Sequence, residues 1–358
     1  MRRILLDKIG SVAANCRLSR EVTVGSEVPA VEGGVVVLKI LSAKTTYNQL
    51  ELPSGRFSMV KPGDVVAGAL GHRKALFGYS GHLPKSVAVG DRLNLLNIGG
   101  VIGVCDGVNP DLGEPFIGEV LGQVLHFPVL GERVGFPAHI SQGAIPVSDA
   151  LDTAGVPVVA VVGTCMNAGK TAAACALVQA FAHRGLVVAA GKATGVSLRR
   201  DILAMEDAGA RRTLIFTDLG VVTTTAEVAA RVARTILTRL AADRPDVIVL
   251  ELGDGVLGLY GVDAILRDPG LRASFGAVVL AANDPVAAWG GVRLLHERFE
   301  VGASVVTGPA TDNIAGTLLV ERETSVAAIN ARSEPTRLAD AILERLGVMA
   351  PGTGDASE

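Results

Sequence analysis

Residues 158–172, VVAVVGTCMNAGKTA, pass from an apolar run into a glycine-rich turn and then into a run of helix-forming residues. The β-branched residues that precede Gly163 predict a buried strand, and Gly163 and Gly169 allow the backbone to turn tightly. In such a turn, successive N–H groups and the positive end of the following helix converge on one place, where they can bind phosphate oxygens. The stretch therefore predicts a strand, a phosphate-binding loop and a helix in succession.

Individual side chains in this stretch indicate a nucleoside triphosphate as the ligand. Lys170 supplies a mobile positive charge for the β- and γ-phosphates, and the Thr171 hydroxyl is placed to ligate Mg²⁺. Five residues separate the two glycines, one more than in the usual pattern, so the loop is a variant. Cys165 lies inside the loop and is expected to be a small apolar filler. The residues expected to contact the nucleotide here are Gly163, Thr164, Asn167, Ala168, Gly169, Lys170 and Thr171.

Composition limits the class of protein. The 358 residues are enough for two domains, and a content of 49% hydrophobic but 4% aromatic residues suits parallel α/β architecture. The net charge of −3, without a basic run, argues against nucleic acid and anionic membrane as partners. No apolar stretch reaches about 18 uncharged residues, and the first residues lack the apolar core of a signal sequence. We therefore expect a soluble, cytoplasmic protein.

The first part of the chain has the pattern of a β-rich domain. Residues 1–150 are punctuated by Gly, Pro, Asp and Asn every eight to twelve residues, between short apolar runs. This spacing predicts a barrel or sandwich. Two phrases, VKPGDVVAG at 60–68 and SVAVGDRLNLL at 86–96, each join a Gly-Asp turn to an apolar run and are expected to form equivalent hairpins.

After a linker placed at 141–157, strands and helices alternate. This alternation predicts an α/β domain over 151–348, a doubly wound parallel sheet with its ligand at the carboxyl ends of the strands. The expected strands are 156–163, 186–192, 213–218, 246–254, 277–284, 303–308 and 326–331. The expected helices are 170–184, 199–209, 225–242, 261–267, 285–299, 311–318 and 335–347. Residues 349–358 are expected to be a disordered tail.

Two acidic residues end the apolar run DVIVLELGD. Glu251 and Asp254 would lie at the carboxyl edge of the sheet, where the phosphate-binding loop must also lie. Mg²⁺ on a nucleotide is normally held by one or two carboxylates besides the hydroxyl. The run also contains glycines at 253, 255 and 258, which imply close approach by a ligand or by backbone. The alternative is that the acids merely terminate a strand.

A lysine and an aspartate follow the next expected strand. Lys192 would lie beside the phosphate-binding loop if its strand neighbours the first one, and there it would position an anionic substrate or the γ-phosphate. Asp201, nine residues later, is expected to be a magnesium ligand or a helix N-cap. The alternative for Lys192 is a solvated lysine that caps its strand.

Recognition of the base is expected from later loops. Asn283, with Asp284, follows the fifth strand, and Gly308 begins the sequence GPATDN after the sixth. The guanine-reading pattern N-K-x-D is absent, which favours ATP and leaves GTP possible. Either loop could equally be a turn that carries an N-cap.

The pattern G-T-x-x-x-x-G-K-T at 163–171 resembles that of dethiobiotin synthetase, whose loop also carries an extra residue. In that enzyme the next strand ends in a lysine before a short turn and a glycine, similar to Lys192-Ala-Thr-Gly195, and Glu251 occupies the matching acid position. The block from Asp201 to Ala210 is similar to the small GTP-binding adaptor of molybdopterin-guanine-dinucleotide synthesis. Asp254 is additional to the dethiobiotin pattern, and residues 1–150 have no counterpart in it.

The resemblance implies a Mg²⁺-dependent P-loop protein that uses ATP, with GTP as the alternative nucleotide, and that forms a homodimer. The expected catalytic residues are Lys170, Lys192, Glu251 and Asp254, and the expected magnesium ligands are Thr171, Glu251 and Asp201. Two functions remain open. One is an ATP-dependent ligase or synthase that phosphorylates a small carboxylate-type substrate. The other is a regulatory or cofactor-delivery NTPase that switches its N-terminal domain between partners.

Overall fold

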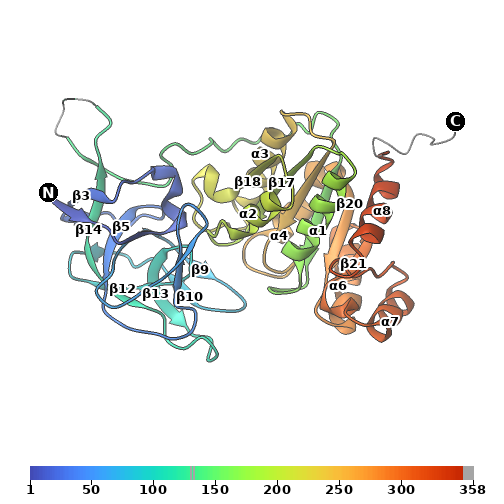
Figure 1. Cartoon of the computed structure of the whole chain (residues 1–358), viewed down its shortest axis with the longest axis horizontal. Helices are drawn as coiled ribbons and strands as arrows, with labels where there is room; N and C mark the ends of the chain where they lie inside the picture. The colour runs from blue at the N-terminus through green and yellow to red at the C-terminus, as the bar shows by residue number, and fades with distance from the viewer. Residues whose placement is uncertain (130, 132–133, 350–358) are drawn as a thin grey trace. The chain divides into compact units, whose positions relative to one another are not determined.

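The computed structural model describes residues 1–129, 131 and 134–349 (Figure 1). All but residue 349 of the expected tail 349–358 lies outside this range. The chain divides into two compact units. The β-rich unit comprises residues 1–146 together with 196–200 and 216–223, and the α/β unit comprises residues 147–195, 201–215 and the rest of the chain from 224. Two short segments of later sequence therefore belong to the first unit.

The β-rich unit is built from strands and 3-10 helices, among them Ser11–Cys16 and, in its later segment, Phe216–Leu219. Its strands are β1 (Arg2–Leu5), β2 (Lys8–Ile9), β3 (Glu21–Gly25), β4 (Glu27–Val28), β5 (Val35–Ile40), β6 (Gln49–Glu51), β7 (Phe57–Met59), β8 (Val65–Leu70), β9 (Arg73–Lys74), β10 (Ser80–His82), β11 (Val87–Ala88), β12 (Arg92–Leu95), β13 (Val101–Gly107), β14 (Ile117–His126) and β15 (Phe136–Pro137).

Five of these described strands close a barrel. Strand β14 pairs with β5 and with β12, β5 pairs with β8, β8 pairs with β13, and β13 pairs with β12. The order of neighbours thus returns to its start, and closure leaves no free edge within the ring. Strand β5 is buried on both faces, because Val35 and Val37 join one apolar cluster while Val36 and Leu38 join another. The predicted barrel-like β domain is confirmed.

The two Gly-Asp phrases form equivalent turns. Gly63 and Gly90 have φ values of 91° and 95°, which glycine adopts without strain. In each turn the aspartate accepts a hydrogen bond from the main-chain N–H three residues earlier, at 2.7 Å for Asp64 and 2.8 Å for Asp91. The strands that follow, β8 and β12, both pair with β13. The two phrases therefore form turns of the same kind, each of which leads into a strand of the barrel.

The α/β unit alternates strands and helices as expected. Its elements are β16 (Val158–Gly163), α1 (Lys170–His183), β17 (Val188–Thr194), α2 (Arg200–Asp207), β18 (Arg212–Ile215), α3 (Ala229–Ala241), β19 (Val247–Leu252), α4 (Val262–Arg267), α5 (Pro269–Ser274), β20 (Phe275–Ala281), α6 (Pro285–Phe299), β21 (Val305–Thr307), α7 (Ile314–Thr324) and α8 (Pro335–Leu346). The described strands form one parallel sheet in the order β18-β17-β19-β16-β20-β21.

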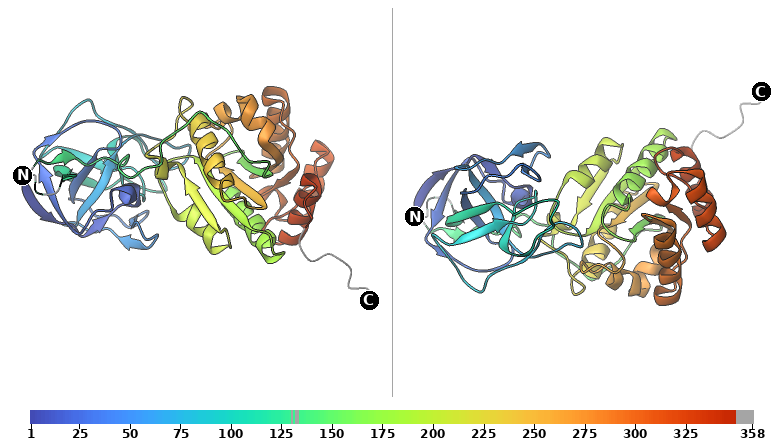
Figure 2. Two further views of the ribbon diagram at one scale, coloured as in Figure 1. Left: turned by 90° about the horizontal axis from the view of Figure 1, so that it is seen from above. Right: turned by 90° about the horizontal axis from the view of Figure 1, so that it is seen from below.

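Helices cover both faces of this sheet (Figure 1; Figure 2). Val159 and Val161 of β16 belong to the apolar cluster that contains α1 and α8. The alternate residues of the strands face the helices on the other side of the sheet. Gly191 of β17 lies so close to α3 that a Cβ there would contact Ile236, and Leu280 of β20 lies so close to α6 that a Cβ at Gly291 would contact it. This alternation is the period of a strand buried on both faces. The doubly wound parallel sheet predicted from the sequence is confirmed.

Two expected strands differ from the prediction. Residues 326–331 contribute an isolated bridge, between Val306 and Ala328, instead of a strand. The N–H of Ala331 donates to the Thr307 hydroxyl, so a side chain takes the place of a ladder carbonyl. The other strand ends at Ile215, three residues early, and Phe216–Leu219 is a 3-10 helix.

Among the described residues, no helix combines the length and the apolar character that crossing a membrane requires.

Candidate functional site

The glycine-rich loop connects the central strand β16 to helix α1. Gly169 is the N-cap of α1 and has φ 95°, a left-handed conformation that a side chain would strain. Asn167 is also left-handed, with φ 60°, and is exposed, whereas Ala168 is buried. The left-handed residues turn the loop toward the start of α1. The glycine-rich turn therefore lies where the sequence predicts it, and phosphate binding by its N–H groups stays a prediction.

Neighbouring backbone holds the loop in place. A Cβ at Gly255 would lie 2.7 Å from the Thr164 carbonyl oxygen, and a Cβ at Gly308 would lie 2.3 Å from the Ala168 carbonyl oxygen. The N–H of Val256 donates to the Gly163 carbonyl at 2.9 Å. The glycine after β19 that the sequence singled out thus admits the backbone of the loop. Gly308, an expected nucleotide contact, lies directly against the loop.

Lys170 is the first residue of α1 and is 6% exposed. Its Nζ donates to the Cys165 carbonyl at 2.7 Å, so the side chain folds back over the loop. Burial lowers the pKa of Lys170, and the Glu251 carboxylate partly opposes this shift. Lys192 and Asp254 also act on Lys170 electrostatically. The other three residues expected to be catalytic therefore all act on the charge of Lys170.

Lys192 is held by two carboxylates. Its Nζ forms a short ion pair with Asp201 and lies 3.4 Å from Glu251 Oε1, and its side chain is 12% exposed. Burial lowers the pKa of Lys192, but the two carboxylates more than offset this and raise it above its usual value. In the sheet Lys192 lies opposite Glu251, since β19 separates β17 from β16. The expected adjacency of the Lys192 strand and the loop strand is not present.

The acidic residues occupy different settings. Asp201 lies in the first turn of α2 and pairs with Lys192, rather than capping the helix. Glu251 is 1% exposed, and its Oε2 is buried and accepts no hydrogen bond from the described residues. Asp254 has φ 69° and turns toward Gly258, where a Cβ would lie 2.6 Å from its Oδ2. Glu251 is thus a buried carboxylate with one oxygen to which no described residue donates a hydrogen bond.

This arrangement is compatible with Mg²⁺. The cation prefers carboxylate and hydroxyl oxygens and retains several waters and phosphate oxygens. Glu251 Oε2 provides such an oxygen, and Thr171, half-buried in the first turn of α1, provides the hydroxyl. Within the described residues, no cluster of three or more His, Cys, Asp or Glu side chains is placed to hold a metal by itself. Magnesium would therefore depend on the nucleotide for its remaining ligands.

The expected base-reading residues lie at the same edge of the sheet. Asn283 is exposed, and its Nδ2 donates to the Cys165 thiol sulfur at 2.9 Å. Asp284 caps α6 and Asn313 caps α7, so the N-cap interpretation holds for these two residues. The sequence did not reveal the contact of Asn283 with Cys165, because 118 residues separate them. This hydrogen bond holds Asn283 beside the glycine-rich loop, where a bound nucleotide would lie.

Two half-buried cysteines, Cys16 and Cys175, give a test of the packing. Burial raises the pKa of Cys16 and of Cys175 from 9.0 to about 11. At pH 8 we expect both to alkylate with iodoacetamide about 100-fold more slowly in the folded protein than in urea, because the thiolate is the reactive form. Mass spectrometry of peptides at timed intervals measures the rates. Equal rates in folded and unfolded protein would contradict the burial of these thiols.

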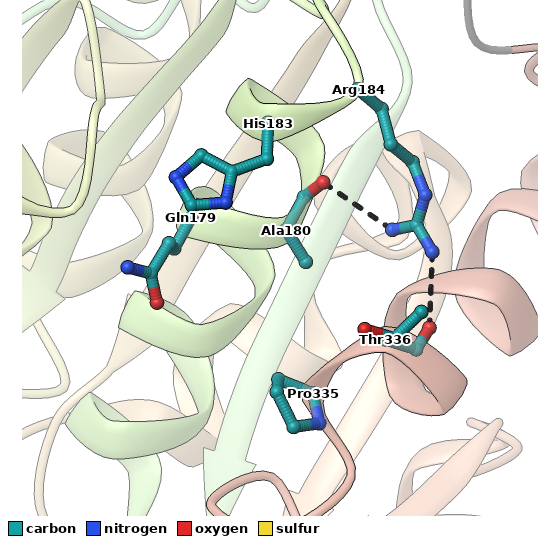
Figure 3. A pocket seen from close by; sticks show the side chains of 6 residues that line it. All are labelled: Gln179, Ala180, His183, Arg184, Pro335 and Thr336. Carbon is teal, nitrogen blue, oxygen red and sulfur yellow. Dashed lines mark hydrogen bonds between the residues drawn. The ribbon is translucent and has the colours of Figure 1, made fainter.

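An open hollow of about 280 Å³ lies at the other end of α1 (Figure 3). Gln179, Ala180 and His183 line it from α1, and Pro335 and Thr336 from α8. Arg184 crosses it and donates to the Ala180 and Thr336 carbonyls at 3.3 and 3.2 Å. These bonds tie α1 to α8. Because α1 is 14 residues long, the hollow lies about 20 Å from the phosphate-binding loop.

No family model matches this chain, and no curated protein matches it. Its fold is similar to solved structures. The signal recognition particle receptor FtsY from Elizabethkingia anophelis is 15% identical over 54% of this chain and 67% of its own, with a TM-score of 0.39. The signal recognition particle 54 kDa protein from Aeropyrum pernix K1, in complex with GDP, is 19% identical over 54% and 49%, with a TM-score of 0.35.

A duf1611 family protein from Anabaena variabilis is 15% identical over 57% of this chain and 63% of its own, with a TM-score of 0.42. None of these three proteins is described as a dethiobiotin synthetase, so the finer resemblance stays a prediction. The fold assignment rests on the strand order and on the loop between β16 and α1. The chain is thus a mixed α/β protein that joins a doubly wound parallel sheet, with a glycine-rich loop before α1, to a β-rich unit.

Proposed function

We propose that this chain is a Mg²⁺-dependent nucleoside triphosphatase. The observation that carries the proposal is that Lys170, the first residue of α1 after the left-handed Gly169, folds back onto the glycine-rich loop and donates to the Cys165 carbonyl. A phosphate-binding loop, a lysine and a carboxylate with an available oxygen are the parts that phosphoryl transfer requires. Bound Mg²⁺ would neutralise charge on the phosphate oxygens.

The residues of the chain have distinct roles in this proposal. The loop N–H groups bind the phosphates, and Lys170 leaves the Cys165 carbonyl to contact the β- and γ-phosphates. Thr171 and Glu251 hold the metal, and Asp254 orients the attacking group. Lys192 and Asp201 fix Glu251 Oε1 through their ion pairs, which leaves Oε2 directed elsewhere. We assign Lys192 and Asp201 a positioning role.

We propose ATP as the nucleotide, since no N-K-x-D sequence is present to read guanine and Asn283 beside the loop can contact either purine. The test is competition between ATP and GTP for a fluorescent ATP analogue bound to the purified chain. Tighter binding of ATP is the expected result. A GTP affinity at least tenfold higher than that for ATP would overturn this choice and leave the triphosphatase proposal standing.

Glu251 should control the magnesium requirement. We expect Glu251→Gln to raise the Mg²⁺ concentration for half-maximal hydrolysis about tenfold, because a neutral amide is a weaker ligand for a hard cation. Hydrolysis measured against Mg²⁺ at saturating ATP gives this value. The matched control is Asp246→Asn, which neutralises an exposed aspartate just before the start of the same strand. An unchanged requirement in Glu251→Gln would place the metal ligand elsewhere.

Nucleotide hydrolysis could serve regulation or ligation. The order in which segments of the two units follow one another along the chain favours regulation. Residues 196–200 belong to the β-rich unit, yet in the sequence they lie between Lys192 and Asp201, the ion pair next to Glu251. A change at this pair is therefore linked through the backbone to a segment of the other unit. In a regulatory NTPase, hydrolysis would use such a link to alter what the β-rich unit binds.

The ligase alternative is favoured by the extra residue in the loop, which is shared with dethiobiotin synthetase. In the proposed ligase reaction, a substrate carboxylate attacks the γ-phosphorus of ATP and ADP leaves. A second group then displaces phosphate from the acyl phosphate. Hydrolysis assays with and without pooled small carboxylic acids separate the two uses. Stimulation by an acid supports the ligase, whereas slow basal turnover that responds only to an added protein supports regulation.

A further inference from the structure

Two cationic and three aromatic side chains gather in the β-rich unit and have no part in the nucleotide site. They are Lys44, Tyr47, Arg73, Tyr79 and Phe116, called the Arg73 cluster below. Arg73, on β9, is 4% exposed, and Tyr79 is 1% exposed. The rings of Tyr47 and Tyr79 meet edge to face with their centroids 5.7 Å apart. The cluster is thus a compact, largely buried group.

The cluster carries positive charge that no ion pair among the described residues neutralises. The Arg73 guanidinium carbon lies 5.7 and 5.8 Å from the centroids of the Tyr47 and Tyr79 rings, and Lys44 Nζ lies 5.0 Å from that of Tyr79. No described acidic side chain forms an ion pair with either cation. Arginine keeps its proton at any physiological pH, and cation–π attraction offsets only part of the cost of burying it. An anion bound beside the Arg73 guanidinium would neutralise this charge.

Lys44 is fully occupied by its own surroundings. Its Nζ donates to the Tyr79 hydroxyl, to the Leu112 carbonyl at 3.1 Å and to the Glu114 carbonyl at 3.0 Å. Three donors therefore have three acceptors. Burial also lowers the pKa of Lys44, and Glu114 partly opposes the shift. Lys44 fixes Tyr79, and the capacity to bind an anion lies with Arg73.

The donors of Arg73 are only half used. Nη1 donates to the Tyr47 hydroxyl at 3.2 Å and to the Leu96 carbonyl, which fixes the plane of the guanidinium. Nε is buried and has no hydrogen-bond partner, and Nη2 donates to no described acceptor. Nε and Nη2 form one edge of the guanidinium, whose two parallel N–H groups match the two oxygens of a carboxylate.

Gly78 packs closely against the guanidinium. It has φ 110°, and a Cβ there would lie 2.5 Å from Nη2 and 3.1 Å from Cζ. Any other residue would be strained and would press on the guanidinium group. The glycine therefore lets the backbone pass beside Arg73 without displacing it.

We propose that the Arg73 cluster binds the carboxylate of a small organic molecule. The Nε and Nη2 donors of Arg73 hold the two oxygens, and the rings of Tyr47 and Tyr79 contact the rest of the molecule. A carboxylate matches a single two-donor edge and one permanent positive charge, whereas a phosphate dianion requires more donors. The site lies within the β-rich unit and does not depend on the proposed triphosphatase activity.

The test uses the full chain labelled with ¹⁵N-arginine and follows the Nε–H signals by NMR. The signal of Arg73 is the one lost in Arg73→Lys. Sodium benzoate or sodium acetate should shift it saturably, and sodium chloride at equal ionic strength should not. The titration is repeated in Lys170→Ala, where an unchanged shift separates this site from the phosphate-binding loop. Sodium phosphate in the same variant asks whether the site prefers phosphate, which would overturn the choice of carboxylate.

Variants complete the test by calorimetry with sodium benzoate. Arg73→Lys keeps a positive charge but loses the two-donor edge, so affinity should fall at least about tenfold. Tyr47→Phe removes the hydroxyl that orients Nη1 and should also weaken binding, which keeps the test valid if Arg73→Lys does not fold. Arg92→Lys, on the exposed start of β12, should bind like the original chain. Equal affinity in all variants, or no saturable binding to the original chain, would overturn the proposal.

Discussion

We expect Lys170→Ala to bind ATP at least about 100-fold more weakly than the original chain. The ammonium group makes charge-assisted bonds to phosphate oxygens, and alanine offers none. A loss of this size corresponds to about 2.7 kcal/mol of binding free energy. Calorimetric titration of ATP with Mg²⁺ into each protein measures it, and hydrolysis should fall below detection for the same reason.

The fold of Lys170→Ala should be intact, since the variant removes a buried cation whose hydrogen bond goes to a loop carbonyl. Its near-ultraviolet circular dichroism and its unfolding midpoint in urea should match the original. Lys85→Ala, at an exposed lysine of the β-rich unit, is the control for loss of a positive charge. Unchanged ATP affinity in a folded Lys170→Ala protein would refute the P-loop assignment, and with it the proposed function.

The second large effect concerns stability. We expect Lys192→Met to lower the free energy of unfolding by about 3 kcal/mol, because it leaves the carboxylates of Asp201 and Glu251 buried without their cation. Urea unfolding at pH 7 measures the loss. Neutralising the acids as well, in Lys192→Met with Asp201→Asn and Glu251→Gln, should restore most of the stability. Arg337→Met, at an exposed pair on α8, should cost less than about 0.5 kcal/mol.

The pH dependence of the free energy of unfolding tests the role of the Lys192 ion pairs in a second way. The pKa of Lys192 is raised in the folded chain, so the folded state holds its proton more tightly than the unfolded state. The resulting stability is complete below the unfolded pKa, about 10.4, and is lost as the pH rises toward the folded value. Lys192→Met should lack this contribution to the alkaline loss. If both proteins lost the same stability above pH 10, the ion pairs would not be the source.

Local sequence predicted the glycine-rich turn between a buried strand and a helix, because its determinants lie within 15 residues. Glycines set the turn, Lys170 starts the helix, and the apolar run before Gly163 forms a buried strand. The acid at position 251 was equally predictable, since parallel strands end at one edge of the sheet. The partners of Lys192 were not, because the strand order places β19 between β17 and β16 and no local pattern encodes that order.

The β-rich unit illustrates the opposite case. Turn residues revealed short strands and the two Gly-Asp turns, but closure of the ring depends on β14 pairing with β5 and β12 across long stretches of chain. The Arg73 cluster was also missed, since Lys44, Arg73 and Phe116 meet only after the barrel has formed. Sequence periodicity reports which residues are buried, and tertiary pairing decides which of them become neighbours.

The assignment of residues 196–200 and 216–223 to the β-rich unit has a consequence for dissecting the molecule. A fragment that ended at Pro146 would lack Val222, which packs in its apolar core, and the Arg199 N–H, which donates to the buried Glu51 at 2.8 Å. The complementary fragment would carry both segments away from their packing partners. No single cut of the chain separates the two units with their cores complete, so either unit can be isolated intact only by a rearranged gene.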